Sequence, residues 1–235
     1  FNGTNGTTYV LRWTITNGDC TSTDDVEISF PLLAQQPDDF TTSSAIVCQG
    51  DIDVEYTVPN DPSVSYTWSY SGTGATIVGS GNSVTVDFAS NATTGVLGVT
   101  ATNSCNTSAP REIGITVNEM PQLTLTVDPA LDTICHGGTT SLDIDFTAGS
   151  GTYDFTISDG INSENLTGVT DDPYTYNKVL NWIDDGTPDT DYTFIITTIT
   201  DSNGCSNTNL GNEGVKVFKL PGTGAVYHIS NGFGN

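Results

Sequence analysis

The sequence predicts an all-β fold, a tandem array of antiparallel β-sandwich domains. Apolar and polar residues alternate with a period of two in one run after another, and no stretch shows helical periodicity. Gly, Asn, Asp, Ser and Pro separate these runs, which is the composition of tight turns. A cysteine pattern also recurs along the chain, so we expect one kind of domain to be repeated.

Each repeat is defined by an opening and a closing segment. The opening segment IVCQG around Cys48 recurs as TICHG around Cys135. The closing segment VLRWTITN before Cys20 matches VLGVTATN before Cys105, and a looser copy, ITDSNGC, ends at Cys205. Each unit therefore opens with Cys-x-Gly and closes with a strand, a polar turn and a second cysteine. Arrays of this kind are usually scaffolds rather than catalysts.

The repeat divides the chain into four predicted segments. Residues 1–31 are expected to be the C-terminal remnant of a repeat, 38–119 a complete sandwich, 121–219 a longer one, and 220–235 a linker or the start of a further repeat. The two linkers are short and contain proline, which predicts a semi-rigid rod. Because residue 1 lies inside a repeat, we expect the natural protein to continue upstream, where its targeting sequence would lie.

The predicted strands of the first complete repeat place apolar side chains on one face and short polar or acidic ones on the other. Trp68 lies on a strand between the two cysteines, as the core tryptophan of immunoglobulin-type sandwiches does. In chain order these strands cover 52–58, 63–70, 84–88, 96–102 and 113–117.

The second complete repeat continues the alternation with longer intervals. Its predicted strands cover 123–127, 142–146, 153–157, 192–200 and 215–217. Between the third and fourth of them lies an excursion, residues 168–188, which we expect to be irregular and which contains Trp182.

Charge excludes two classes of partner. The chain has 28 acidic and 5 basic residues and a formal net charge of −23. Nucleic acid and anionic membrane surfaces repel such a chain, whereas calcium, cationic surfaces and neutral glycans do not. The longest apolar runs, such as residues 194–196, are far too short to span a bilayer, so we expect no membrane insertion.

The five cysteines predict two disulfide bonds in the register of the repeat. Cys48 is expected to pair with Cys105 and Cys135 with Cys205, while Cys20 is unpaired because its opening partner belongs to the upstream sequence. Each bond would stabilise the fold by roughly 4 kcal/mol on the chain-entropy model. The alternative is a set of unpaired buried thiols. Disulfide bonds favour an extracellular location.

Two clusters in the second repeat are candidate binding sites. Four acidic residues in one loop carry the oxygen ligands that Ca²⁺ prefers, and the alternative is a solvated acidic loop. Three aromatic residues of the excursion are candidates for stacking on sugar rings, and the alternative is that they cover the edge of the core. The candidate calcium ligands are Asp184, Asp185, Asp189 and Asp191, and the candidate glycan-binding residues are Tyr174, Tyr176 and Trp182.

We expect no enzymatic activity and no zinc site. The two histidines, His136 and His228, have no Ser or Cys partner at a recognisable spacing. The cysteines are single and far apart, whereas zinc sites use closely spaced pairs.

These segments resemble a known group of repeats. The run GTTYVLRWTITNG with Cys20, the segment from Cys48 to Val117 with Tyr66-Thr67-Trp68 inside it, and the third unit ending DSNGC at Cys205 are similar to PKD-like or Ig-like repeats. Such repeats occur in very long surface proteins of Bacteroidetes, including gliding-motility adhesins exported by the type IX secretion system.

The resemblance implies a structural spacer or stalk segment of a very long cell-surface adhesin, without catalysis. Its partners would be neighbouring repeats of the same chain, and surface glycans or a protein of the secretion or motility apparatus. The alternative function is a calcium- or glycan-binding accessory module of a secreted multidomain enzyme.

Overall fold

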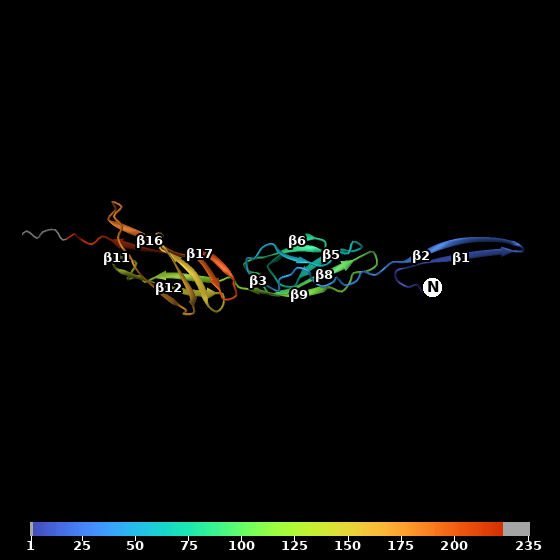
Figure 1. The fold of residues 1–235 in the computed structure, drawn as a ribbon, viewed down its shortest axis with the longest axis horizontal. Helices are drawn as coiled ribbons and strands as arrows, with labels where there is room; N and C mark the ends of the chain where they lie inside the picture. Colours follow the sequence, from blue (N-terminus) through green and yellow to red (C-terminus); the bar gives the residue numbers. More distant parts are fainter. Residues whose placement is uncertain (1, 223–235) are drawn as a thin grey trace, which may run out of the picture. The chain divides into compact units, whose positions relative to one another are not determined.

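The computed structural model describes residues 2–222, and in this part of the chain every regular element is a β-strand (Figure 1). The described residues form two units, with the division between Asn118 and Glu119. The predicted fold class, all-β with tandem Ig-like antiparallel sandwiches, is confirmed.

The first unit begins with a two-stranded hairpin. Strands β1 (Thr7–Asn17) and β2 (Cys20–Phe30) pair with each other over their full length and with no other strand among the described residues. Gly18 has φ +58° in the turn between them, a conformation that favours glycine.

The sandwich of the first unit packs a four-stranded sheet, in the order β3-β9-β8-β5, against a three-stranded sheet, β4-β7-β6. Tyr56, Phe88 and Leu97 are among the fully buried side chains between the sheets. The strands are β3 (Ile46–Cys48), β4 (Val54–Thr57), β5 (Ser65–Tyr70), β6 (Ala75–Ser80), β7 (Ser83–Phe88), β8 (Gly95–Thr102) and β9 (Arg111–Asn118).

The second unit packs a five-stranded sheet, β11-β17-β16-β13-β14, against a three-stranded sheet, β10-β12-β15. Its core is larger and is centred on Leu142, Ile144, Phe194 and Ile196. The strands are β10 (Gln122–Val127), β11 (Thr133–Cys135), β12 (Thr139–Ala148), β13 (Tyr153–Ser158), β14 (Ser163–Val169), β15 (Tyr174–Val179), β16 (Asp189–Asp201) and β17 (Ser206–Phe218).

Residue alternation explains most of this core, and one β-bulge explains the rest. Along β16 the buried positions fall on even numbers up to Ile196 and on odd numbers from Ile199. The register against β13 shifts at this point, since Ile157 lies opposite Ile196 but the preceding Thr156 lies opposite Thr198, which leaves one extra residue on β16. A bulge inserts one residue and so moves the side chains that follow it to the other face. It thereby directs the Asp201 side chain into the interior, where it is 5 % exposed.

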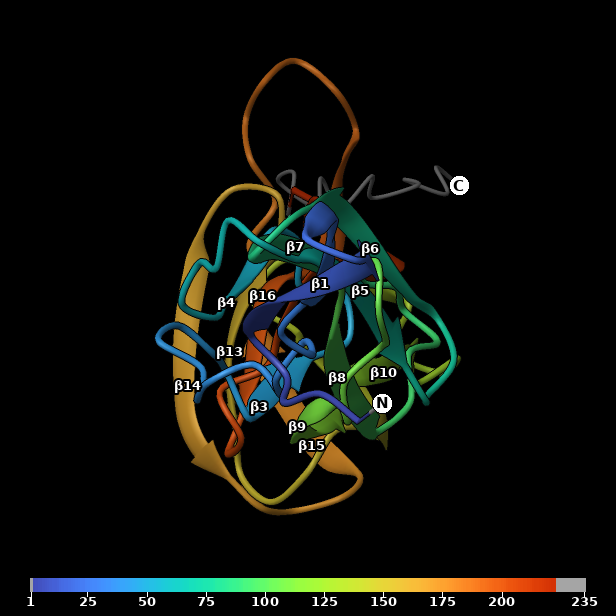
Figure 2. The same cartoon turned by 90° about the vertical axis from the view of Figure 1, so that its right-hand side faces the viewer.

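The prediction of an irregular segment over 168–188 was wrong in part. Residues 174–179 form β15, which pairs with β12 and places Tyr176 in the core. Strands β6 and β14, and the three-residue strands β3 and β11, were also not predicted. The remainder of the segment, from Leu180 to Pro188, is a loop that projects from its sandwich (orange in Figure 2).

Trp68 does not occupy the centre of the first core. Its ring is half-buried, packs against Phe40 at a centroid distance of 6.1 Å, and donates its indole N–H to the carbonyl of Gly81. Tyr56 on β4 is fully buried instead and donates its hydroxyl proton to the Ser44 carbonyl.

Candidate functional site

In both sandwiches the short strand that ends at the Cys-x-Gly motif pairs in parallel with the last strand, whereas the other strand pairs among the described residues are antiparallel. Strand β3 lies along the end of β9, with Cys48 opposite Asn118, and β11 lies along the end of β17 in the same way. We call each such pair a terminal clamp: β3 with β9, and β11 with β17.

The Cys-x-Gly motif is the turn that ends each clamp. Gln49 donates its backbone N–H to the Asn118 carbonyl at 2.9 Å, and His136 donates to the Phe218 carbonyl at 2.8 Å. The glycine that follows, Gly50 or Gly137, has a positive φ of +89° or +79°. A residue with a Cβ rarely adopts that conformation, so the motif needs glycine at this position.

In each unit the segment that precedes the clamp also runs beside the last strand or the turn before it. In the first unit Ala34 donates its N–H to the side chain of Asn106, and the Arg111 side chain donates to the Pro37 carbonyl. Further along, Thr116 donates its N–H to the Ala45 carbonyl. Residues 34–48 therefore run beside residues 106–118 in the same direction.

The second unit repeats this arrangement. Asn207 donates its side-chain amide to the Pro121 carbonyl, and Lys216 donates its N–H to the Asp132 carbonyl. The chain thus enters each sandwich at one end of the last strand and leaves at the other. A pull on the two ends of a sandwich acts along the clamp, so its hydrogen bonds resist together rather than one after another.

The closing cysteines lie in turns held by an Asn or Asp side chain. In the second unit the Asp201 carboxylate accepts backbone N–H groups from Asn203, Cys205 and Ser150. In the first unit the Asn103 side-chain oxygen accepts from the N–H of Cys105 in the same manner. The polar turn seen in the sequence is therefore a hydrogen-bonded cap on the hairpin of the last two strands.

The two predicted disulfide pairs are not formed. Cys105 and Cys135 are free and exposed, as is Cys20, whereas Cys48 and Cys205 are disulfide-bonded.

Strand geometry explains why the opening and closing cysteines of one sandwich cannot pair. Cys48 lies opposite the last residue of β9, and Cys105 precedes the first residue of that strand. The length of β9 separates them by roughly 23 Å, well beyond the ~7 Å over which a disulfide can join two Cα atoms. In the second unit Cys135 and Cys205 lie at opposite ends of β17, which is longer still.

The candidate calcium ligands do not converge. Asp189 and Asp191 both bind the ammonium group of Lys216, at 3.0 and 2.8 Å. These bonds, first to Asp191 and then to Asp189, raise the pKa of Lys216. Asp185 accepts hydrogen bonds from the hydroxyl and N–H of Thr187, which lower its pKa.

Among the described residues no three His, Cys, Asp or Glu side chains lie close enough to hold a metal ion. Lys216 neutralises Asp189 and Asp191, and the carboxylate of Asp185 accepts hydrogen bonds within a turn. The prediction of a calcium site over 184–191 is therefore not supported by the structure.

The candidate glycan-binding aromatics do not form a platform. Tyr174 and Tyr176 point to the same face of β15, where Tyr174 packs edge-on against Phe155 and Tyr176 is buried. Trp182 is half-buried, and the ammonium of Lys219 lies 4.4 Å from its ring centroid. The sequence also allowed the alternative that these rings cover the edge of the core. Their positions in the structure agree with that alternative.

Tyr176 is held by a partly buried polar contact. Its hydroxyl donates to the Glu164 carboxylate at 2.7 Å, and Lys178 binds the same oxygen at 3.1 Å. Burial, followed by the bond to Glu164, raises the pKa of Tyr176 to about 12. The hydroxyl is therefore neutral and remains a hydrogen-bond donor to the carboxylate at physiological pH.

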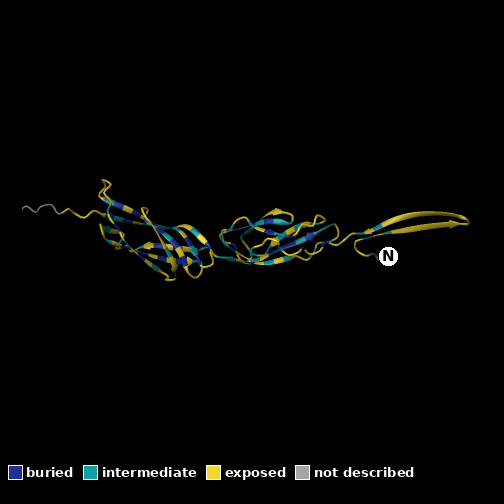
Figure 3. Cartoon of the chain, viewed as in Figure 1, coloured by how far each residue is buried: buried dark blue, intermediate teal, exposed yellow. Residues whose placement is uncertain are grey.

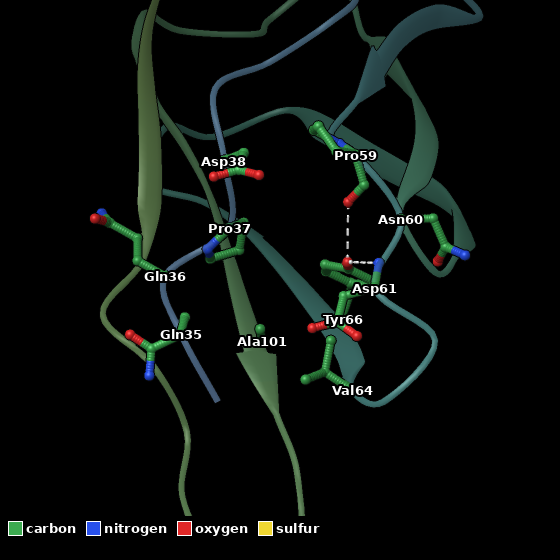
Figure 4. A pocket seen from close by; sticks show the side chains of 10 residues that line it. All are labelled: Gln35, Gln36, Pro37, Asp38, Pro59, Asn60, Asp61, Val64, Tyr66 and Ala101. Carbon is green, nitrogen blue, oxygen red and sulfur yellow. Dashed lines mark hydrogen bonds between the residues drawn. The ribbon is translucent and has the colours of Figure 1, made fainter. Parts of the chain in front are cut away.

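The pocket in Figure 4 is a shallow hollow at one end of the first sandwich, with a volume of about 150 Å³. Ligand sites usually enclose about 300–1,000 Å³. The Tyr66 hydroxyl in it already has partners, since it accepts the N–H of Asp61 and donates to the Pro59 carbonyl. The lining residues are Gln35, Gln36, Pro37, Asp38, Pro59, Asn60, Asp61, Val64, Tyr66 and Ala101.

His136 joins two segments of the second unit. Its Nδ1 accepts the backbone N–H of Trp182 at 3.1 Å and so joins the Cys-x-Gly turn to the projecting loop. His228, and most of the predicted linker 220–235, lie outside the described residues. None of the described residues belongs to a helix that is long and apolar enough to cross a membrane.

The sequence did not reveal the terminal clamps. Strands β3 and β11 are three residues long, too short to show an alternating pattern. The available signal was the Cys-x-Gly motif itself, because a recurring glycine after a short apolar run indicates a turn with positive φ.

Comparison with known proteins agrees with the fold of the first unit. The chain matches none of the curated proteins. Among solved structures it resembles an I-band fragment of titin (TM-score 0.42, 12 % identity, 93 % of this chain and 76 % of that chain). It also resembles the ICAM-5 ectodomain fragment (TM-score 0.46, 14 % identity, 92 % and 57 %).

A third similar structure contains the fibronectin(III)-like modules of CbhA from Clostridium thermocellum (TM-score 0.33, 14 % identity, 80 % and 96 %). These likenesses are too distant to carry a functional argument. Residues 34–115, however, match the family model of the PKD-like domain, and this match covers the first sandwich.

Proposed function

We propose that this chain is a spacer segment of a secreted, very long cell-surface adhesin, and that it acts by resisting tension rather than by catalysis. The observation that carries the proposal is the terminal clamp, which is built in the same way in both sandwiches. A spacer between a cell and an adhesive tip is pulled at its two ends. Parallel pairing of the short strand before the Cys-x-Gly turn with the last strand opposes that pull along the strand direction.

The remaining features agree with this role. The net charge of −23 keeps such a chain soluble and away from anionic surfaces. The disulfide-bonded Cys48 and Cys205 favour an oxidising, extracellular compartment. The partners under this proposal are neighbouring repeats of the same chain and a protein of the export or motility apparatus. Proteins with repeats similar to these are exported by such an apparatus.

We do not propose the alternative of a calcium- or glycan-binding accessory module. The acidic loop is neutralised in part by Lys216, and Tyr174 and Tyr176 pack inward. No observation on the described residues favours that function.

Single-molecule force spectroscopy on the whole chain tests the proposal. Gln49→Pro and His136→Pro each remove one clamp N–H, whereas Gln49→Ala and His136→Ala keep it and lose the same side-chain contacts. One backbone hydrogen bond contributes about 1 kcal/mol, so each proline variant should speed forced unfolding of its own sandwich roughly fivefold.

The alanine variants should unfold at forces close to those of the parent chain. If proline and alanine variants unfold at the same force, the clamp does not set mechanical resistance and the spacer proposal loses its main support.

A further inference from the structure

His136 holds the base of the projecting loop of the second unit. Its ring nitrogen Nδ1 accepts the backbone N–H of Trp182 at 3.1 Å. From residue 181 to residue 188 the loop is exposed, apart from the half-buried Trp182 (Figure 3). An imidazole nitrogen accepts a hydrogen bond only while it carries no proton. The contact therefore requires the neutral ring, with its single proton on Nε2.

The first sandwich has a side chain at the same place, with different chemistry. Gln49 is the middle residue of its Cys-x-Gly motif, and the side-chain amide donates to the Ala92 carbonyl at 3.1 Å. Ala92 lies in the loop between β7 and β8. In both units the middle residue of the motif thus joins the opening turn to a loop of its own sandwich. Of the two side chains, only that of histidine changes its charge between pH 5 and pH 8.

Protonation of His136 removes the basis of its contact with the loop. The imidazolium ion is a donor at both ring nitrogens, so its Nδ1–H and the N–H of Trp182 would face each other without an acceptor. A second positive charge lies on the same tryptophan, because the ammonium of Lys219 is 4.4 Å from the centroid of the Trp182 ring. Both features favour separation of the loop from the turn once the ring is charged.

The charged groups around the turn do not hold the protonated ring in place. Lys216 binds Asp189 and Asp191, and Lys178 binds Glu164, so these groups are engaged with one another. Among residues 2–222 no ion pair includes His136. The other charged groups on the neighbouring segments are Asp132 before β11, Asp184 and Asp185 in the loop, and Lys219 after β17.

We propose that His136 is a pH-sensitive latch, which binds the projecting loop to the opening turn at neutral pH and releases it when mild acid protonates the ring. Only the Trp182 contact responds. The backbone N–H of His136 continues to donate to the Phe218 carbonyl, because the ring takes no part in that bond. The latch therefore goes beyond the load-bearing role of the clamp and does not depend on it.

Amide hydrogen exchange of the 235-residue chain, followed by NMR, tests this inference. After correction for the intrinsic exchange rate, protection of the Trp182 amide should fall roughly fivefold or more between about pH 7.5 and about pH 5, the loss expected for one hydrogen bond. The Leu180 amide, which donates to the Gly138 carbonyl, is the internal control and should stay protected. Equal protection of the Trp182 amide at the two pH values would overturn the proposal.

Two variants separate the latch from a general effect of acid. His136→Gln supplies a side-chain oxygen that accepts the Trp182 N–H without titrating, so protection should remain high at both pH values. His136→Ala removes the acceptor, so protection should be low at both. In each variant the exchange of the Leu180 amide reports whether the turn is folded. If the Trp182 amide of His136→Gln loses protection under acid as the parent does, other groups cause the change and the proposal is wrong.

Discussion

At the scale of single residues, hydrogen-bonded side chains fix the turns that define the repeat. Asp201 is the most buried of these, and its carboxylate accepts three backbone N–H groups. Asp51 has the corresponding role at the opening turn, where its carboxylate accepts the N–H of Cys48 at 2.8 Å. Local contacts of this kind explain why small polar residues recur beside the cysteines.

Replacing Asp201 by alanine should destabilise the second unit by about 2–4 kcal/mol, because three N–H groups lose a charged acceptor and are left near a buried site. Amide hydrogen exchange of β16 and β17 measures this loss. Asp184→Ala, in the exposed loop, is the control and should have no effect. An equal effect of the two substitutions would show that the Asp201 contacts do not support the hairpin.

The contacts of Glu164 predict a pH dependence. Hydrogen bonds, first from Tyr176 and then from Lys178, lower the pKa of Glu164 from its ordinary 4.5. A lowered pKa in the folded state adds stability above pH 4.5, and this contribution disappears as the pH falls through the folded-state pKa.

Comparing the parent chain with Glu164→Gln in urea unfolding checks this dependence. The advantage of the parent should be greatest at neutral pH and should shrink steadily under acid. A difference that stays constant from neutral to acid pH would show that the ionised carboxylate contributes nothing.

At the scale of elements, the last strand of each sandwich organises everything else. It carries the terminal clamp at its end and the closing turn at its beginning, and its length keeps the two cysteines of one sandwich apart. The same element therefore decides both the mechanical arrangement and the pattern of free thiols.

Alkylation without reduction should label Cys20, Cys105 and Cys135, because these thiols are free and exposed. Cys48 and Cys205 should become reactive only after reduction. Mass spectrometry of the labelled peptides gives the result, with the fully reduced and denatured chain as the control. Recovery of a disulfide-linked peptide joining Cys48 to Cys105, or Cys135 to Cys205, would contradict the strand geometry.

At the scale of the whole molecule, the acidic side chains are kept out of the hydrophobic cores. Acidic residues occupy the outward positions of strands such as β12, where Asp143 and Asp145 alternate with buried Leu142, Ile144 and Phe146. The strong net charge is therefore compatible with closely packed interiors, because hardly any of it enters them. It does not by itself create a metal site.

Thermal unfolding should not respond specifically to calcium. A site with the affinity of extracellular calcium modules would raise the melting temperature by several degrees at ~10 mM Ca²⁺. Because a chain with a charge of −23 responds to ionic strength in general, the control is a magnesium salt at the same ionic strength. A rise that only calcium produces, and that Asp184→Asn removes, would restore the predicted site.

Much of the fold follows from local pattern. Alternation identified the strands that carry the core, such as β12 and β13, because a period of two determines which side chains share a face. The repeated cysteine segments identified tandem units, since self-similarity requires no knowledge of contacts. The short β3 and β11 escaped notice because three residues contain too little pattern, and their position depends on a partner strand some seventy residues or more away.

The candidate sites depended on tertiary structure for a different reason. The sequence placed Asp189 and Asp191 near one another but did not show Lys216, which reaches them only through the pairing of β16 with β17. The repeat placed the cysteines at equivalent positions of each unit, but equivalent positions do not bring the two cysteines of one sandwich close together in space. By itself the sequence determined the fold class, the repeat and the charge, which are sums and periods over neighbouring residues. Only the tertiary structure decided which cysteines are free and which strands form the clamps, because both depend on strands that are distant in the sequence.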